Sequence, residues 1–388
     1  MKDIDVVFYM DLVAAARKAH ATGNFEGAEV LASKAIRMAP HLPSAHIAMG
    51  VIKLRQGKWQ GAHSELNKAY MMRRGVRSTI ANRAFERQPP SSLTISRLRH
   101  DLEQLEYLVA NGRISKSFQN KTRDLKSLLQ MADSVGYAGG GFEVTGTIKE
   151  MIKDFYDKAV NLYLPEAIKG GALNPKLRIR EIEKAYFAKD RRIVYFDDFL
   201  NPKALAQMRR FCLESTFWYD SKAAGYLGAY IDDGFTCGLL FQIAEELKTK
   251  FSKIYDNDAL RLAWAYKYDS KLSGIGVHAD DARVNSNFWL SPNEANLDSQ
   301  SGGMIVWPCK PPGNWSFRDY NSQESAKETQ RFELLKKSKQ APIKVTYRQN
   351  RMVIFDSQYL HKTDNLKFKE GYENRRINVT LLYDHKFR

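Results

Sequence analysis

A chain of 388 residues with 44% hydrophobic residues and a net charge of +16 has the composition of an ordinary soluble globular protein, and it is long enough for two domains. It contains no apolar run near the ~18 residues that a membrane span requires, and its acid-containing N-terminus lacks the features of a signal peptide. Its three widely spaced cysteines argue against a disulfide framework or a cysteine zinc site, so a cytoplasmic location without a membrane partner is expected.

The positive charge is concentrated in the first third of the chain. Residues 1–130 hold 21 Lys and Arg against 11 Asp and Glu. Such a region is either a solvated basic surface or a surface that attracts acidic protein, phosphate or nucleic acid. Because no recognised nucleic-acid reading motif and no base-stacking motif accompany the charge, a nucleic-acid partner is not expected.

A repeat with a period of 34 residues begins the chain. Gly23, Phe25, Ala28 and Ala35 recur as Gly57, Trp59, Ala62 and Ala69. This period is typical of helix–turn–helix solenoid repeats, in which the glycine permits the tight turn and the small residues allow helices to pack closely. Residues 8–74 therefore resemble two units of the tetratricopeptide repeat family, although Arg74 stands where Pro40 ends the first unit.

Further helices are expected to cap these repeats, because two units are fewer than the three that usually make a stable array. The periodicity predicts helices over residues 94–111 and 115–134, after a break at Pro89-Pro90. Together with the repeats they make a predicted helical domain at residues 1–135.

A region of linker and supporting helices is predicted at residues 136–190. It starts with the glycine-rich stretch 136–141, which is typical of a hinge, and a helix is expected over residues 148–164.

From residue 192 onward the pattern changes to short β-type runs separated by turn residues. Strands are predicted at residues 192–199, 261–268, 286–290, 303–307, 343–347, 351–355 and 376–383. Asn201-Pro202 marks the start of a helix that runs through Cys212. An insertion at residues 310–340 is predicted to be a loop followed by a helix over 325–337, and it is either a lid or a solvated surface segment.

His278 and Asp280 are two positions apart on an extended segment, so their side chains point to the same side. A second histidine, His361, brought in by a distant strand, would complete a face of three ligands. Two histidines and one carboxylate on one face, with the other positions open, are typical of non-haem Fe(II) oxygenases. Asp281 would be the carboxylate instead if the register slipped by one residue.

The second half of the chain, residues 192–384, resembles the prolyl 4-hydroxylase-like family of 2-oxoglutarate- and Fe(II)-dependent oxygenases. The motifs that carry the resemblance are Tyr268 ten residues before His278, Asn287-Phe288-Trp289-Leu290 followed by Gly302-Gly303, Met352-Val353-Ile354-Phe355 leading into His361, and Arg376-Ile377-Asn378. The resemblance implies a double-stranded β-helix (jelly-roll) oxygenase domain at residues 191–388. The predicted fold class is therefore α+β, with an N-terminal helical repeat region followed by this domain.

The resemblance also implies roles for individual residues. The Fe(II) ligands would be His278, Asp280 and His361, leaving positions for 2-oxoglutarate and O2, with ascorbate as a candidate reductant. Arg376 shares a strand face with Asn378 and Thr380 and suits the far carboxylate of the keto acid. Asn378 stands where the family often has serine. Tyr268 is either a contact to the co-substrate or a core aromatic residue.

The implied activity is that of a dioxygenase that hydroxylates an unactivated C–H bond of an amino acid or other small metabolite, with release of succinate and CO2. Because Asp280 occupies the place that a halide would need, hydroxylation is favoured over halogenation, while desaturation, epoxidation and demethylation use the same iron site. The polar residues expected to hold the substrate are Arg283, Asn285 and Arg351.

The helical repeats leave an alternative open, in which the substrate is a protein or peptide that the repeats recognise. The repeats could equally mediate self-association or support the oxygenase domain. A scaffold protein with a vestigial oxygenase domain is disfavoured, because the ligands and the anchoring arginine are all present.

Overall fold

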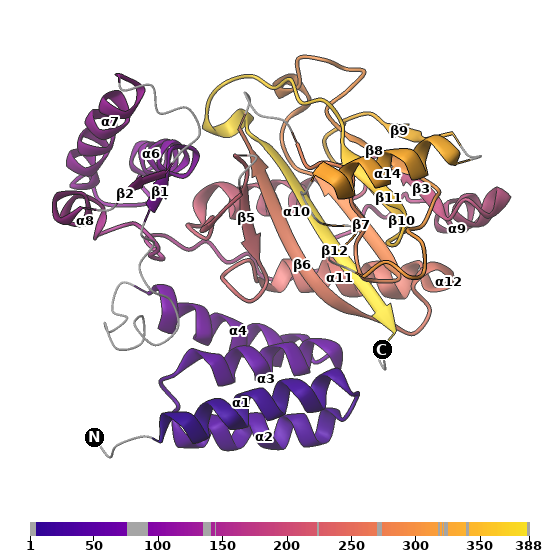
Figure 1. Cartoon of the computed structure of the whole chain (residues 1–388), viewed down its shortest axis with the longest axis horizontal. Helices are drawn as coiled ribbons and strands as arrows, with labels where there is room; N and C mark the ends of the chain where they lie inside the picture. The colour runs from indigo at the N-terminus through magenta and orange to yellow at the C-terminus, as the bar shows by residue number, and fades with distance from the viewer. Residues whose placement is uncertain are drawn as a thin grey trace.

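The computed structural model describes residues 5–75, 92–134, 141–143, 145–222, 225–269, 274–316, 319, 321, 325–338 and 341–385. The N-terminal helices lie below and beside a β-rich region that contains the second half of the chain (Figure 1). The predicted break at Pro89-Pro90 and most of the predicted linker at residues 136–141 lie outside the described residues.

Four helices form the first group: α1 (Val6–Ala21), α2 (Phe25–Met38), α3 (Pro43–Arg55) and α4 (Trp59–Arg74). The N-terminal region is thus helical, as predicted. Gly23 and Gly57, which are 34 residues apart, both have positive φ, at 79° and 73°, and each makes the turn between two helices. The small residues of the repeat are fully buried between the helices: Ala28, Ala35, Ala62 and Ala69.

A second helical group contains α6 (Ile95–Ala110), α7 (Phe118–Ser134) and α8 (Gly146–Ile152), with strand β1 (Ser92–Thr94) paired to β2 (Gly141–Glu143). It confirms the two helices predicted to follow the repeats. The helix predicted over residues 148–164 is wrong beyond Ile152. There the backbone N–H groups of Asn161 and Tyr163 donate to the hydroxyls of Thr216 and Ser215, at 3.2 and 3.0 Å, so tertiary hydrogen bonds replace helical ones.

The β-rich region consists of two antiparallel sheets. The larger has, in spatial order, β3 (Ile193–Phe196), β10 (Met352–Asp356), β7 (Val284–Trp289), β12 (Arg376–His385), β6 (Asp258–Tyr268), β5 (Leu227–Tyr230) and β4 (Asp220–Ser221). The smaller has β11 (Leu360–Thr363), β8 (Met304–Trp307) and β9 (Ile343–Val345). These confirm the predicted strands. The sequence did not indicate β4 and β5, because Leu-Gly-Ala-Tyr contains no β-branched residue.

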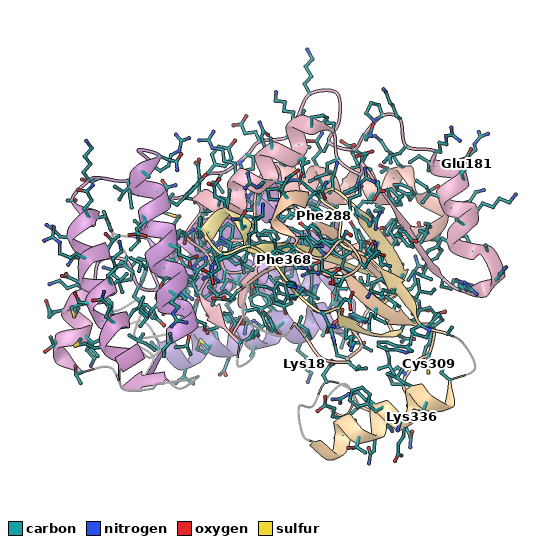
Figure 2. The ribbon with its side chains drawn as sticks, turned by 90° about the horizontal axis from the view of Figure 1, so that it is seen from above. Lys18, Glu181, Phe288, Cys309, Lys336 and Phe368 are labelled. Atoms are coloured by element: carbon teal, nitrogen blue, oxygen red, sulfur yellow. The ribbon has the colours of Figure 1, made fainter. Side chains whose placement is uncertain are left out.

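Helices α10 (Pro202–Glu214) and α11 (Gly238–Lys250) pack against one face of the larger sheet, where the apolar residues of β12 join the main core. The opposite face turns toward the smaller sheet, and Trp289, Val306 and Phe355 are among the residues that fill one end of the space between them. Phe368 belongs to this cluster between the sheets, whereas Phe288 belongs to the main core on the other face, and both are labelled in Figure 2. The other end of the space is polar and contains the site described below.

The first helical group is attached to the β-rich region through α4. Trp59 Nε1 donates to Glu245 of α11 at 2.8 Å, and the Tyr70 hydroxyl donates to the carbonyl of Thr216 at 3.1 Å. Leu66 and Tyr70 are fully buried in the same apolar core as the sheet. The first two helical pairs and the sheet are therefore parts of one packed structure. Within the described ranges, no helix combines the length and apolar character that crossing a bilayer would demand.

Candidate metal centre

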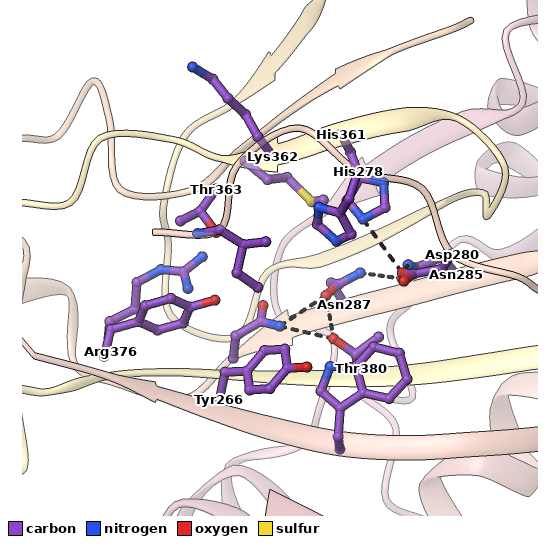
Figure 3. A pocket seen from close by; sticks show the side chains of 15 residues that line it. Tyr266, His278, Asp280, Asn285, Asn287, His361, Lys362, Thr363, Arg376 and Thr380 are labelled. Atoms are coloured by element: carbon purple, nitrogen blue, oxygen red, sulfur yellow. Dashed lines mark hydrogen bonds and ion pairs between the residues drawn. The ribbon is translucent and has the colours of Figure 1, made fainter. Parts of the chain in front are cut away.

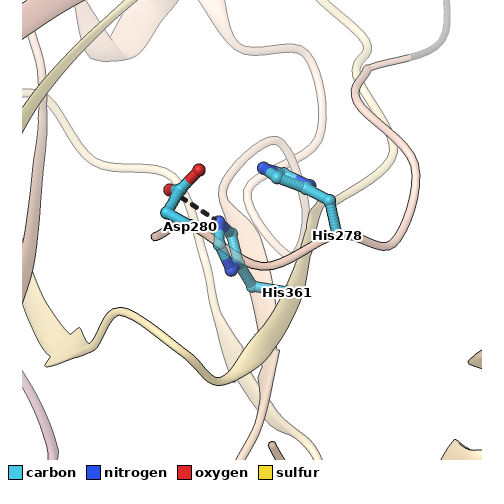
Figure 4. A group of neighbouring side chains, drawn as sticks. All are labelled: His278, Asp280 and His361. Carbon is cyan, nitrogen blue, oxygen red and sulfur yellow. Dashed lines mark ion pairs between the residues drawn. The ribbon is translucent and has the colours of Figure 1, made fainter. Parts of the chain in front are cut away.

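Backbone pairing brings His278, Asp280 and His361 together. His278 and His361 exchange both backbone hydrogen bonds, at 2.9 and 2.8 Å. The segment that contains His278 thereby forms an antiparallel bridge to β11, which contains His361. Asp280 N–H donates to the carbonyl of Ser357 at 3.0 Å, which keeps the segment extended. The two-residue spacing therefore places His278 and Asp280 on the same side, facing His361 (Figure 4).

One ligand atom from each of these three side chains lies within 4.8 Å of the other two. Each imidazole has its Nδ1 2.9 Å from a backbone carbonyl two residues upstream, that of Gly276 for His278 and that of Tyr359 for His361. A carbonyl only accepts, so Nδ1 carries the proton and Nε2 keeps its lone pair. Both rings are thereby held as the tautomer that presents Nε2 to a metal ion.

The electrostatics of the cluster favour a neutral His278 beside an ionised Asp280. Burial of the ring, reinforced by the neighbouring His361, lowers the pKa of His278 to about 4. Burial opposes ionisation of Asp280, but its interactions with the two histidines and the hydrogen bond from Asn285 outweigh this effect and lower the pKa of the carboxyl. At neutral pH His278 and Asp280 thus have the protonation states that a divalent cation requires.

A pH dependence of stability follows for protein freed of metal by a chelator. The unfolded chain protonates His278 near its ordinary pKa of 6.5, whereas the folded protein does so only near 4. The contribution of neutral His278 is therefore complete above pH 6.5 and is lost as pH falls toward 4. Between pH 7.5 and 5, we expect urea unfolding to show a loss on the order of 1–2 kcal/mol more than in His278→Gln. Equal losses in the two proteins would contradict this.

Arg376 lies at the far side of the same pocket, across from Asp280 (Figure 3). Its guanidinium is buried and donates from Nε to the carbonyl of Gly302 at 2.7 Å and from Nη2 to that of Gly303 at 3.1 Å. Nη1 is buried without a hydrogen-bond partner among the described residues. Burial lowers the pKa of Arg376. A buried donor on an arginine with no carboxylate partner fits an anionic ligand.

The glycine pair that precedes β8 is needed for this arrangement. A Cβ on Gly303 would clash with the carbonyl oxygen of Val345 in β9, so only glycine allows these two neighbouring strands of the smaller sheet to approach so closely here. The carbonyls of the pair are then free to hold Arg376.

A network of amides and a hydroxyl forms the floor of the pocket between Arg376 and the metal cluster. Asn378 donates to Asn287 at 3.0 Å, Thr380 donates to Asn287 at 2.7 Å, Asn287 donates to Asn285, and Asn285 donates to Asp280 at 2.7 Å. The register of β12 on β7, which pairs Thr380 with Asn287, sets up this row. The network orients the Asp280 carboxylate, so its Oδ2 is already hydrogen-bonded.

An aromatic wall borders the pocket on the side of β6. Trp264, Tyr266 and Tyr268 alternate along β6, opposite Thr380, Asn378 and Arg376 of β12. Tyr226 and Tyr230 of the neighbouring hairpin pack against this row. The pocket so enclosed has about 390 Å³ of empty space, part of it open to solvent.

The insertion at residues 310–340 contributes a support behind the ligands. Its helix α14 (Ser325–Lys337) confirms the predicted helix, and Lys336 on it lies at the edge of the molecule (Figure 2). Leu334 and Leu335 pack toward Val277, Ala279 and Leu360, which flank the two histidines in the chain.

The structure brings together some of the residues predicted to hold substrate or co-substrate and separates others. The pocket is lined by the metal cluster with Arg376, Asn378, Tyr268 and Asn285. Arg283 instead pairs with buried Asp258, and Arg351 pairs with Asp197 at 2.6 Å, outside the pocket. Arg283 immediately precedes β7 and Arg351 immediately precedes β10, and neither lines the pocket, so their expected contact with substrate is not supported.

Asp281, which a slip in register would have made the carboxylate ligand, points elsewhere, as does Arg375, the neighbour of Arg376 in the chain. Asp281 is paired with Arg261 at 2.9 Å, and Arg375 is paired with Glu103 at 2.6 Å. Thr380 was expected on the strand face of Arg376, and Asn287 was named within a motif of the resemblance, whereas Trp264 and Tyr266 were given no role at the site. Only the strand alternation with Arg376 and Tyr268 could have indicated them.

The sequence matches no protein-family model and no curated protein. Solved structures similar to the chain include the non-heme alpha-ketoglutarate-dependent carbocyclase SnoK from nogalamycin biosynthesis, at 11% identity over 56% of this chain and 88% of that chain, with a TM-score of 0.39. They also include a prolyl-4-hydroxylase from Pseudomonas putida, at 10% identity over 53% and 98%, with a TM-score of 0.35.

A third is EctD from S. alaskensis with 2-oxoglutarate and 5-hydroxyectoine, at 10% identity over 58% and 82%, with a TM-score of 0.35. TM-scores of this size are too low to decide the fold or the reaction. The chemistry of the site therefore has to follow from its own residues.

Proposed function

We propose that the protein is an Fe(II)- and 2-oxoglutarate-dependent dioxygenase that hydroxylates an unactivated C–H bond of an amino acid or other small metabolite, with release of succinate and CO2. One observation carries the proposal. A His–Asp–His cluster with both Nε2 atoms available shares a single pocket with a buried arginine whose Nη1 has no partner in the described part of the chain. The first suits a divalent iron, and the second suits the far carboxylate of a keto acid.

The residues present fit these two groups. The ligands of Fe(II) would be His278, Asp280 and His361, and the distal carboxylate of 2-oxoglutarate would pair with Arg376, beside Asn378 and Tyr268. Bound Fe(II) with 2-oxoglutarate supplies the oxidising chemistry with O2, for which ascorbate is a candidate reductant.

The chain's own contribution is to orient and to exclude water. The row from Thr380 through Asn287 and Asn285 holds the Asp280 carboxylate in one orientation. Because the pKa of Asp280 is lowered, this carboxylate stays ionised at neutral pH and remains a ligand. A halide then has no place at that position, which favours hydroxylation. The aromatic wall excludes water from the side of β6.

The pocket favours a small molecule over a folded protein as substrate. With Arg283 and Arg351 engaged in ion pairs elsewhere, the pocket-lining groups left to contact a substrate include Trp264, Tyr266 and Thr380. The alternative of a peptide held by the helical repeats has less support, since Trp59, Tyr70 and Arg74 of α4 already contact the β-rich region.

We also propose that α1–α4 are two tetratricopeptide-like repeats within a helical domain at residues 1–135, followed by a linking region at 136–190. Residues 191–388 would then be the double-stranded β-helix domain. Support comes from the 34-residue spacing of Gly23 and Gly57 and from the polar pocket between two antiparallel sheets. A cytoplasmic location remains the expectation from the cysteine content.

Spectroscopy under anaerobic conditions tests the proposed function directly. Fe(II) and 2-oxoglutarate together are expected to give a weak visible charge-transfer band, because the keto acid can chelate the iron. Glutarate, which lacks the keto group, is the matched control and should give none. Oxygen should then produce succinate, and a screen of amino acids, other metabolites and peptides should find compounds that accelerate its release. Absence of the band at saturating Fe(II) and 2-oxoglutarate would refute the assignment.

A further inference from the structure

We propose that helices α4 and α6 position the 2-oxoglutarate anchor, Arg376, through Tyr219 and the β4–β5 hairpin. The inference rests on the proposed function, because it assigns the N-terminal helices a part in binding the co-substrate. The path is a continuous series of contacts from the helices to the pocket.

The path begins at Tyr219, the residue immediately before β4. Its ring lies under the guanidinium of Arg74, whose Cζ is 4.0 Å from the ring centroid, and near that of Arg97 at 5.3 Å. Arg97 also donates from Nη1 to the Tyr219 carbonyl at 2.8 Å. The Tyr219 hydroxyl lies 2.9 Å from that of Tyr70 on α4. Both helical groups thus hold one aromatic residue of the β-rich region, by its ring, its hydroxyl and its backbone.

The two arginines are themselves fixed by carboxylates. Arg74 makes a two-pronged pair with Asp233, at 3.0 and 2.7 Å. Arg97 donates from Nε to both oxygens of Asp101, each at 2.8 Å. Because both guanidiniums are buried and paired in this way, their planes have little freedom to rotate. Tyr219 therefore contacts two rigid partners.

A second contact reaches β4 from the helical side. The Thr94 hydroxyl, at the start of α6, lies 2.7 Å from the hydroxyl of Ser221. Ser221 pairs with Leu227 of β5, and Leu227 pairs with Lys267 of β6. The position of the hairpin at the edge of the sheet is thus set from the helices as well as from β6.

The hairpin in turn contacts the residues around Arg376. The Tyr226 ring stacks on that of Tyr268, with centroids 5.2 Å apart and an interplanar angle of 27°, and meets Tyr266 edge-on at 5.0 Å. Tyr268 lies against the guanidinium of Arg376, with Cζ 4.9 Å from the ring centroid. The face of Arg376 is therefore bounded by a ring that Tyr226 holds in place.

This path predicts different effects on the binding of 2-oxoglutarate and on the binding of the metal ion. Tyr268 bounds one face of the Arg376 guanidinium, in addition to the glycine carbonyls that hold it, so a displaced hairpin should weaken 2-oxoglutarate binding. The metal ligands His278 and His361 are held by their mutual backbone bridge and are not on the path. Metal affinity should therefore stay unchanged when the helical contacts are broken.

The test uses the full-length protein and compares Arg97→Gln with Tyr226→Leu. The Kd of Mn(II) is measured by titration, and the Kd of 2-oxoglutarate is measured from the anaerobic charge-transfer band with Fe(II). We expect both variants to raise the Kd of 2-oxoglutarate about 3–10-fold and to leave the Kd of Mn(II) unchanged. The double variant should have a Kd for 2-oxoglutarate no higher than that of the single variant with the higher Kd, because both changes break the same path.

Arg113→Gln is the matched control. Arg113 follows α6 and links the helical region to Glu214 at 2.9 Å, but it does not contact Tyr219, so both Kd values should stay as in the wild type. Arg97→Lys, which keeps the charge beside Tyr219, should recover part of the 2-oxoglutarate affinity. Should Arg97→Gln fail to fold, Tyr226→Leu on the hairpin itself decides the question.

Unchanged 2-oxoglutarate affinity in Tyr226→Leu would overturn the inference while leaving the proposed function intact. A parallel loss of Mn(II) and 2-oxoglutarate affinity would also overturn it, because that result indicates general destabilisation. A wild-type protein that binds Mn(II) but gives no band with Fe(II) and 2-oxoglutarate would refute the proposed function first, and the inference with it.

Discussion

Replacement of His361 by alanine is expected to abolish metal binding at neutral pH and, with it, all succinate release. His361 is buried, its Nδ1 is held by the Tyr359 carbonyl, and its Nε2 lies 3.5 Å from Asp280 Oδ2. Removal of one of three protein ligands should cost more than the roughly 10–100-fold in affinity that loss of an outer hydrogen-bonding partner costs. Titration with Co(II), followed by its visible absorption, measures the metal affinity without requiring catalytic turnover.

The matched control is His41→Ala, since His41 is exposed in the turn before α3 and far along the chain from the pocket. It should bind Co(II) as the wild type does. If His361→Ala retained wild-type affinity, the cluster could not be the metal site, whatever the activity of the protein.

The second large effect is expected at Arg376. Arg376→Ala should weaken 2-oxoglutarate binding by about 100-fold or more, because two charge-assisted hydrogen bonds to the distal carboxylate are worth about 3 kcal/mol or more together. The metal affinity should persist, since Arg376 lies across the pocket from the ligands. The anaerobic charge-transfer band, titrated with 2-oxoglutarate at fixed Fe(II), reports this change without a substrate.

Arg351→Gln provides the comparison for that experiment. Arg351 is also an arginine next to a strand of the same sheet, but it pairs with Asp197 outside the pocket. Its loss should reduce stability and leave the Kd of 2-oxoglutarate as it was. An equal loss in both variants would mean that Arg376 acts only through the fold.

Much of the metal site could be predicted from local rules. The spacing of His278 and Asp280 determines that both side chains share a side whenever the segment is extended, and backbone pairing with His361 keeps it so. The same alternation places Arg376 and Asn378 on one face of β12, and the structure lines the pocket with both. Predictions of this kind succeed because strand geometry is a property of neighbouring residues.

Predictions about residues whose partners lie far away in the chain were less accurate. Arg283 and Arg351 are near the metal ligands or their strands in sequence, yet each has a carboxylate closer in space, Asp258 or Asp197. The helix expected beyond Ile152 was likewise replaced by hydrogen bonds to Ser215 and Thr216. Composition and periodicity contain no information about such partners.

By itself, the sequence predicted the helical N-terminal region, most of the strands and the three residues that meet as a candidate metal cluster, because periodicity and spacing act over a few residues. Only the tertiary structure decided that Asn285 and Asn287 orient Asp280, that Tyr226 completes the aromatic wall, and that α4 and α6 hold Tyr219. These contacts join residues far apart in the chain. They depend on strand register and on how the helices pack against the sheet, which no short segment specifies.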